Sequence, residues 1–174
     1  MDTKAGEHQT YGISELPVLD VTPEAFAPFG TVIAPKEDGT PFSDADAKLD
    51  LSRGTPRFYA MRLPARGLTV KQITRHTRVT QTLASAGGDP WFIAVAPPSK
   101  LDDATAEPAI QDIKAFRIPG DYAIMLYKGT WHAGPHFEGK DQSFFNLELA
   151  DTNVVDHQTC KLTERYGRAL LLKA

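Results

Sequence analysis

Residues 122–137 read YAIMLYKGTWHAGPHF, and this stretch decides the predicted fold class. Its first part, YAIMLYK, has the apolar and aromatic composition of a short β-strand. Its second part sets His132 and His136 among two glycines, a proline and a tryptophan. We predict a turn and the start of another strand there, with Gly134 and Pro135 as turn residues. The two histidines raise the question of whether this turn borders a catalytic pocket.

Similar short runs recur on both sides of this stretch. Each is rich in β-branched or aromatic residues and is closed by Gly, Pro or Asp. The runs are RFYAMRL (57–63), LTVKQITRH (68–76), VTQTLAS (79–85), WFIAVAP (91–97), DIKAFRI (112–118), YAIMLYK (122–128) and SFFNLELA (143–150). This series of short strands separated by turns is typical of an all-β sandwich or barrel.

Helices and loops fill the remaining sequence. The segment VTPEAFAPFG (21–30) predicts one short helix, because Thr22 suits the N-cap, Pro23 the first helical position and Gly30 the end. Residues 35–51 and 98–112 are rich in turn-forming and acidic residues and predict exposed loops. The terminal LTERYGRALLLKA (162–174) predicts either a helix or a strand.

Length and composition bound the class of protein. A chain of 174 residues predicts a single domain over residues 1–174, with a flexible or loosely packed N-terminus over residues 1–15. With 41% hydrophobic and 24% charged residues, the composition is that of a globular protein rather than a disordered one.

The charge, the lack of long apolar runs and the N-terminal sequence predict the location of the protein and the kinds of partner it has. The net charge of −3, without clustered Lys and Arg, argues against a nucleic-acid partner. No apolar run approaches the ~20 residues of a membrane-spanning helix, so no membrane partner is expected. Cys160 is the single cysteine and the N-terminal MDTKAGEHQT is polar, which predicts a reducing, cytoplasmic setting.

Strand alternation in SFFNLELA (143–150) separates an apolar face from a face that carries Phe144, Asn146 and Glu148. Asn and Glu are disfavoured in strands and costly to bury without partners. If this face points inward, it predicts a cavity with a polar floor. If it points outward, it is simply a solvated face, and alternation alone does not choose between the two.

The segment ITRHTRVTQT (73–82) raises a similar question. Read as a strand, it places Gln72, Thr74 and His76 on one face and Arg75 on the other. A lone histidine in a strand is more often a surface or hydrogen-bonded core residue than a ligand. Alternation alone therefore leaves the role of His76 open.

The order of these residues resembles the cupin family. Cupins carry the motifs G(X)5HXH(X)3-4E(X)6G and G(X)5PXG(X)2H(X)3N, which bind a metal through three histidines and a glutamate inside a small barrel. Here Thr74, His76 and Gln81 occupy the His, His and Glu positions of the first motif, His132 matches the second, and His136 replaces its asparagine. The resemblance implies a cupin-type, jelly-roll-like β-barrel with a few short peripheral helices, and with His132 aimed into the barrel.

A narrower resemblance covers most of the chain. Residues 19–33, 74–98 and 113–137 are similar to the ureidoglycolate lyase family, formerly called ureidoglycolate hydrolases, which are cupins. Residues 49–59 and 146–157 look most like a plant-and-bacterial subgroup of that family. The resemblance implies cleavage of (S)-ureidoglycolate to glyoxylate and urea, a step in purine and allantoin breakdown.

This reaction is the collapse of a carbinolamine. A base takes the hydroxyl proton, an acid protonates the departing nitrogen, and a cation holds the carboxylate. Histidine suits the proton transfers because its unperturbed pKa lies near neutrality. The resemblance implies catalytic roles for His76, His132, Tyr127 and Glu148, without deciding which is the base and which the acid. It implies substrate binding by a second set: Arg75, Gln81, Lys128 and Asn146.

The resemblance also implies candidate partners. His76, Gln81 and His132 are candidate ligands for a divalent metal such as nickel, manganese or zinc. We expect weak binding, because Gln81 is a poor ligand and Thr74 replaces a histidine. The cupin resemblance suggests a homodimer that acts on a small-molecule substrate. Two alternatives stay open: a cupin that binds a small carboxylate metabolite without turnover, and a metal-dependent cupin isomerase or dioxygenase.

Overall fold

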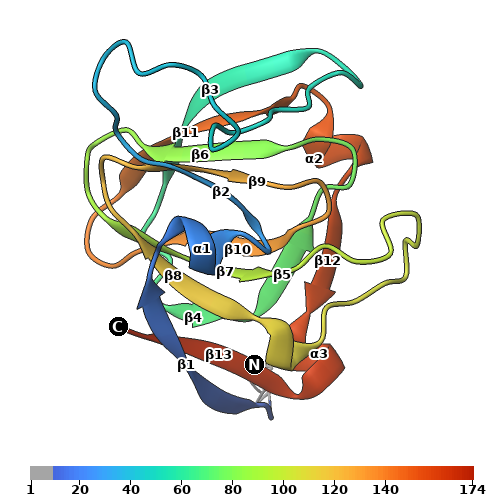
Figure 1. The fold of residues 1–174 in the computed structure, drawn as a ribbon. Coiled ribbons are helices and arrows are strands. Elements are labelled where there is room, and N and C mark those ends of the chain that lie inside the picture. The colour runs from blue at the N-terminus through green and yellow to red at the C-terminus, as the bar shows by residue number, and fades with distance from the viewer. Residues whose placement is uncertain (1–9) are drawn as a thin grey trace, which may run out of the picture.

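The computed structural model describes residues 10–174, which form two facing β-sheets and a few short helices (Figure 1). The strands are β1 (Gly12–Asp20), β2 (Gly30–Ile33), β3 (Pro56–Leu63), β4 (Thr69–Val70), β5 (Gln72–Arg75), β6 (Gln81–Ser85), β7 (Trp91–Ala96), β8 (Lys114–Ile118), β9 (Ala123–Leu126), β10 (Trp131–His136), β11 (Gln142–Leu149), β12 (Gln158–Lys161) and β13 (Arg168–Lys173). The helices are α1 (Pro23–Phe26), α2 (Thr152–Val155), α3 (Leu162–Tyr166) and the 3-10 helix η1 (Ile110–Asp112).

The two sheets curl toward each other into a barrel-like arrangement. The larger sheet has the order β12-β5-β10-β7-β8-β1-β13-β4, and the smaller has the order β2-β9-β6-β11-β3. In Figure 1 the smaller sheet lies at the top and faces the β5, β7, β8 and β10 part of the larger one. The prediction of an all-β, cupin-type barrel with short peripheral helices is confirmed.

All seven predicted runs contain a strand. One of them, residues 68–76, splits into β4 and β5, which pair with different neighbours: β4 with β13, and β5 with β10 and β12. The run WFIAVA in β7 is apolar throughout because both of its faces are buried. Trp91, Ile93 and Val95 pack between the two sheets, whereas Ala94 and Ala96 pack in a second core on the other face.

The predicted helix is correct at its start and too long at its end. The Thr22 hydroxyl accepts a hydrogen bond from the backbone N–H of Ala25 at 3.1 Å, so it caps α1 as expected. The helix ends at Phe26, and Gly30 instead begins β2. A Cβ at Gly30 would lie 1.9 Å from the carbonyl oxygen of Met125, so the close pairing of β2 with β9 requires glycine.

Both ends of the described chain join the larger sheet. Strand β1 runs parallel to β13 and to β8, a long-range pairing that no local pattern indicated. Of the N-terminus expected to be flexible or loosely packed, residues 1–9 lie outside the described residues, whereas residues 12–15 belong to β1. The terminal segment contains both of its predicted alternatives, since α3 is followed by β13.

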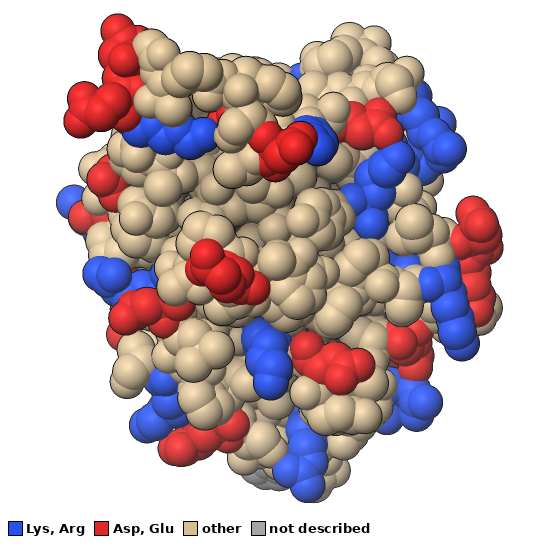
Figure 2. Space-filling view, in the orientation of Figure 1, with Lys and Arg blue, Asp and Glu red and all other residues tan. Residues whose placement is uncertain are grey.

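Charged side chains of both signs are interspersed over the face shown in Figure 2. The loop of residues 35–51 has no helix or strand and is mostly exposed, as predicted. Within residues 10–174, no helix is both long and apolar enough to span a membrane.

Candidate functional site

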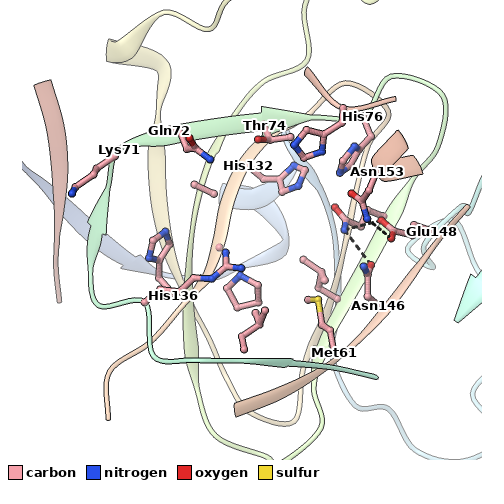
Figure 3. Close-up of a pocket in the computed structure, with 18 of the residues that line it drawn as sticks. Met61, Lys71, Gln72, Thr74, His76, His132, His136, Asn146, Glu148 and Asn153 are labelled. Atoms are coloured by element: carbon pink, nitrogen blue, oxygen red, sulfur yellow. Dashed lines mark hydrogen bonds between the residues drawn. The ribbon is translucent and has the colours of Figure 1, made fainter. Parts of the chain in front are cut away.

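A cavity of about 780 Å³ opens between the two sheets and gathers most of the predicted site residues. The larger sheet contributes side chains from β5 and β10, and the smaller contributes side chains from β3, β6 and β11 (Figure 3). Because strand side chains alternate, each of these strands turns one face toward the cavity and the other away from it.

His132 is buried in this cavity, with 8% of its surface exposed. It follows Trp131 in β10, and Trp131 points to the opposite side and is fully buried in the core. The Nδ1 of His132 lies 3.1 Å from the carbonyl oxygen of Thr130. A carbonyl only accepts hydrogen bonds, so Nδ1 carries the proton and Nε2 keeps a free lone pair. Burial, helped by the nearby His76, lowers the pKa of His132 to about 3.

His76 lies beside His132, with 5.1 Å between the ring centroids. Its Nδ1 donates to the carbonyl oxygen of Asp156 at 2.6 Å, so its Nε2 is also the free nitrogen. Burial lowers the pKa of His76, while the bond to Asp156 and the charge of Glu148 oppose that shift. At neutral pH both imidazoles are therefore mainly uncharged and able to accept a proton.

A polar wall faces the histidines from the smaller sheet. Asn146 and Glu148 are buried and point inward with Phe144, so the predicted polar-floored cavity is present and the alternative of a solvated face is wrong. Gln81 Nε2 donates to Asn146 Oδ1 at 3.1 Å and to Glu148 Oε2 at 3.4 Å. These hydrogen bonds hold the three side chains as one network.

Three residues of the site were missed by the sequence reasoning. The Tyr59 hydroxyl donates to Glu148 Oε1 at 3.3 Å, and Asn153 Nδ2 donates to the same oxygen at 3.1 Å. The ring centroid of His157 lies 5.5 Å from that of His76. Alternation in β3 would have grouped Tyr59 with Met61 on the inward face. Asn153 lies in the short helix α2 and His157 in the connection that leads to β12, and neither segment is long enough for its periodicity to aim a side chain.

The structure places Arg75, a predicted substrate-binding residue, outside the cavity. Its side chain is fully buried on the face of β5 opposite His76. The guanidinium lies 4.8 Å from the ring of Trp131 and donates to Gln158 Oε1 and to the carbonyl oxygens of residues 99, 100 and 103. Arg75 therefore anchors the loop of residues 98–106, and these hydrogen bonds engage four of its five N–H donors.

Tyr127 and Lys128, which were predicted as site residues, also lie outside this cavity. Strand β9 ends at Leu126, and the two residues lie in the turn before β10. They border a separate depression of about 440 Å³, where Lys128 Nζ lies 2.6 Å from Asp50 Oδ2. Neither side chain lines the cavity that holds the histidines.

The other end of β10 differs from the prediction as well. Gly134 and Pro135 are not turn residues; they lie within β10, where its register against β7 shifts between Ala133 and His136. The ring of His136 returns to the cavity, but on the side away from His76 (Figure 3). Its Nδ1 donates to the carbonyl oxygen of Gly67 at 3.0 Å.

The donor set does not fit a tightly held metal. Among residues 10–174, no group of three or more His, Cys, Asp or Glu is arranged to hold an ion. His76 and His132 offer free Nε2 atoms, but His136 lies too far round the cavity to join them. The hydroxyl of Thr74 is hydrogen-bonded to that of Thr159 at 2.9 Å. The two imidazoles and the amide that were predicted as ligands are a weak set for a transition metal.

Comparison with known proteins gives one consistent result. A family model described as ureidoglycolate lyase matches residues 40–166. The chain is 30% identical over 139 residues to the ureidoglycolate lyases of Pseudomonas entomophila (strain L48) and Pseudomonas putida (strain W619), covering 67% of this chain and 74% of each relative. It is 26% identical over 140 residues to that of Stutzerimonas stutzeri (strain A1501), covering 67% of this chain and 72% of the relative.

Proposed function

Because the chain belongs to the ureidoglycolate lyase family, we propose that it cleaves (S)-ureidoglycolate to glyoxylate and urea. The observation that carries the proposal is the pair of buried histidines, each of which donates its Nδ1–H to a backbone carbonyl and keeps Nε2 free. Such a pair supplies proton-transfer groups inside a cavity large enough for a small hydroxy acid.

His132 is the better candidate for the base. Its Nδ1 donates to the carbonyl oxygen of Thr130, so its Nε2 lone pair is available, and burial keeps the ring uncharged at neutral pH. It takes the proton of the carbinol hydroxyl, the C–N bond breaks, and the electron pair of the O–H bond forms the carbonyl of glyoxylate. The bound substrate is an anion, which favours the imidazolium that this step creates.

His76 is the better candidate for the acid. The charge of Glu148 favours protonation of His76, and the anionic substrate adds to that effect. His76 is mainly uncharged in the free protein, so in this proposal it takes up a proton from solvent when the anionic substrate binds. The resulting imidazolium protonates the departing ureido nitrogen and so releases urea. The proton that His132 has taken then returns to His76, which balances the reaction. Environments that favour different protonation states in two neighbouring groups are a common basis for such a division of roles.

The polar wall supports these two groups. Glu148 accepts hydrogen bonds from Tyr59, Gln81 and Asn153, which fix its carboxylate beside His76. The substrate-binding roles predicted for Gln81 and Asn146 stay predictions. Tyr59 replaces Tyr127 in this proposal as the phenol of the site, because Tyr59 lines the cavity.

We keep a weakly held divalent metal as part of the proposal, with His76, Gln81 and His132 as its candidate ligands. Such an ion would polarise the carbinol hydroxyl, but no step above depends on it. Dialysis against a chelator, followed by addition of nickel, manganese or zinc, tests this. We expect little metal to survive the chelator; full metal occupancy after dialysis would contradict a weak site.

The same family membership supports a proposal about the wider setting. We propose that the enzyme acts in purine and allantoin breakdown, in the cytoplasm, as a homodimer of single-domain chains. The family match and the histidine pair favour turnover over mere binding of a carboxylate metabolite. The donor set gives no support to a metal-dependent isomerase or dioxygenase.

The direct test measures glyoxylate release from (S)-ureidoglycolate. The purified protein should exceed the spontaneous rate, and His132→Asn should return the rate to the spontaneous level. A wild-type rate equal to the spontaneous rate would refute the proposed function.

A further inference from the structure

The cavity has a cationic side that faces away from the histidine pair. Among the described residues that line the cavity, the permanently charged cations are Arg66 and Lys71, and the one carboxylate is Glu148. Glu148 belongs to the polar wall beside His76, whereas His136 marks the other side of the cavity in Figure 3. Arg66 lies on the His136 side, because the carbonyl oxygen of the next residue, Gly67, accepts a hydrogen bond from His136.

The backbone next to Arg66 is tied to the end of β10. The Gly67 N–H donates to the carbonyl oxygen of Phe137 at 3.1 Å, and the Gly67 carbonyl accepts from His136 Nδ1 at 3.0 Å. Gly67 has a φ of 66°, in the left-handed region that favours glycine. The backbone of the connection between β3 and β4 is thereby held against the cavity wall, and the exposed side chain of Arg66 lines the cavity from there.

Arg66 carries a charge that the described protein groups do not neutralise. The ion pairs among residues 10–174 join other side chains and leave Arg66 out. Lys71 is a weaker candidate for a ligand inside the cavity, because its side chain runs away from His132 in Figure 3. The Lys71 Nζ lies 5.9 Å from the ring centroid of Tyr11.

A substrate carboxylate needs a cation, but both cations that the sequence predicted for substrate binding interact with other groups outside the cavity. Arg75 is buried under its loop, and Lys128 is paired with Asp50 outside the cavity. A guanidinium matches a carboxylate with two parallel hydrogen bonds, which also orients the bound molecule. Arg66 is the arginine that the cavity offers for this contact.

We propose that Arg66 binds the carboxylate of the substrate and so sets its orientation in the cavity. With the carboxylate at Arg66, the carbinol carbon extends toward His132 and His76, and the ureido group extends toward the polar wall of Asn146 and Glu148. This inference rests on the proposed function for the identity of the substrate. The contact itself predicts selection for small carboxylates over their neutral analogues.

The test uses oxalurate, which has the carboxylate and ureido groups of ureidoglycolate but no carbinol to collapse, together with its neutral amide. Binding of both to wild type, Arg66→Met, Lys71→Met and Arg62→Met is measured by calorimetry. Arg62 is exposed on β3 and lies outside the cavity lining, so it controls for the loss of an arginine. Circular dichroism and thermal melting check that each variant is folded.

Arg66→Met should weaken oxalurate binding by about 10- to 100-fold, the range for a hydrogen bond to a charged group, and leave binding of the amide unchanged. Arg62→Met and Lys71→Met should change neither. The KM for ureidoglycolate should rise more than kcat falls, with partial rescue by Arg66→Lys.

Three results would overturn the inference: no oxalurate binding by the wild type, equal losses for oxalurate and the amide, or a larger effect at Lys71 than at Arg66. Failure of the proposed function looks different. In that case glyoxylate would form only at the spontaneous rate, while oxalurate would still bind in a manner that depends on Arg66.

Discussion

The Nδ1 of His76 lies 2.6 Å from the backbone carbonyl oxygen of Asp156, a residue 80 positions further along the chain. The Asp156 carboxylate also accepts hydrogen bonds from the backbone N–H groups of Thr77 and Arg78, at 2.8 and 2.9 Å. Asp156 therefore holds the turn after β5 and sets the tautomer of His76 at the same time. The candidate acid of the site depends on a contact between distant segments.

Replacement of Asp156 tests this contact. Asp156→Ala leaves two backbone N–H groups without acceptors and should lower the free energy of unfolding by about 1–3 kcal/mol. Because the turn that carries His76 loosens, kcat per folded molecule should also fall. Urea unfolding and steady-state kinetics measure both. Asp151→Ala is the control, since the exposed Asp151 caps α2 without a side-chain hydrogen bond; equal effects at the two positions would contradict the proposed role.

Replacement of His132 tests the base. His132→Asn should reduce glyoxylate release by about 10²-fold or more, the usual contribution of a positioned acid-base group. The fold should persist, because a polar side chain in a cavity adds little to core packing. Activity is compared with the melting temperature of the same sample. A variant that melts early but keeps full activity per folded molecule would show that His132 is structural.

The two tyrosines provide a matched pair of variants. Tyr59→Phe removes the hydroxyl that donates to Glu148 and should lower kcat by about 10-fold, equivalent to one hydrogen bond. Tyr127→Phe removes the same atom outside the cavity and should leave kcat unchanged. Steady-state kinetics of the two variants decide this. The opposite order of effects would restore the assignment of Tyr127 as a catalytic residue.

The buried histidines predict how stability depends on pH. The pKa of His132 is lowered to about 3 in the folded protein, from an ordinary value of 6.5. Between these values the unfolded chain binds more protons than the folded one, so this contribution to stability is complete above pH 6.5 and is lost as the pH falls toward 3. Urea unfolding at several pH values should show this loss, and His132→Asn should show a smaller one. Equal slopes for the two proteins would contradict the burial of a neutral His132.

Much of the barrel could be predicted because strand formation leaves a local signal. The apolar and β-branched runs correctly predicted the strands from β3 to β11, with the exception of β10. For β10, the sequence predicted only a turn followed by the start of a strand. Strand β1 was missed, since its exposed outer positions and central Pro17 weaken its pattern and its pairing partner β13 lies at the other end of the chain. The bulge in β10 was read as a turn, because Gly134 and Pro135 suit either.

The sequence by itself determined which side chains share a face. Alternation alone grouped Asn146 with Glu148 and separated His76 from Arg75, and the structure keeps both divisions. Only the tertiary structure decided which face borders the cavity and which cations remain free within it. Arg75 and Arg66 have the same chemistry, yet Arg75 donates to a neighbouring loop and Arg66 lines the cavity. The partners of a long side chain come from distant segments, and local periodicity carries no information about them.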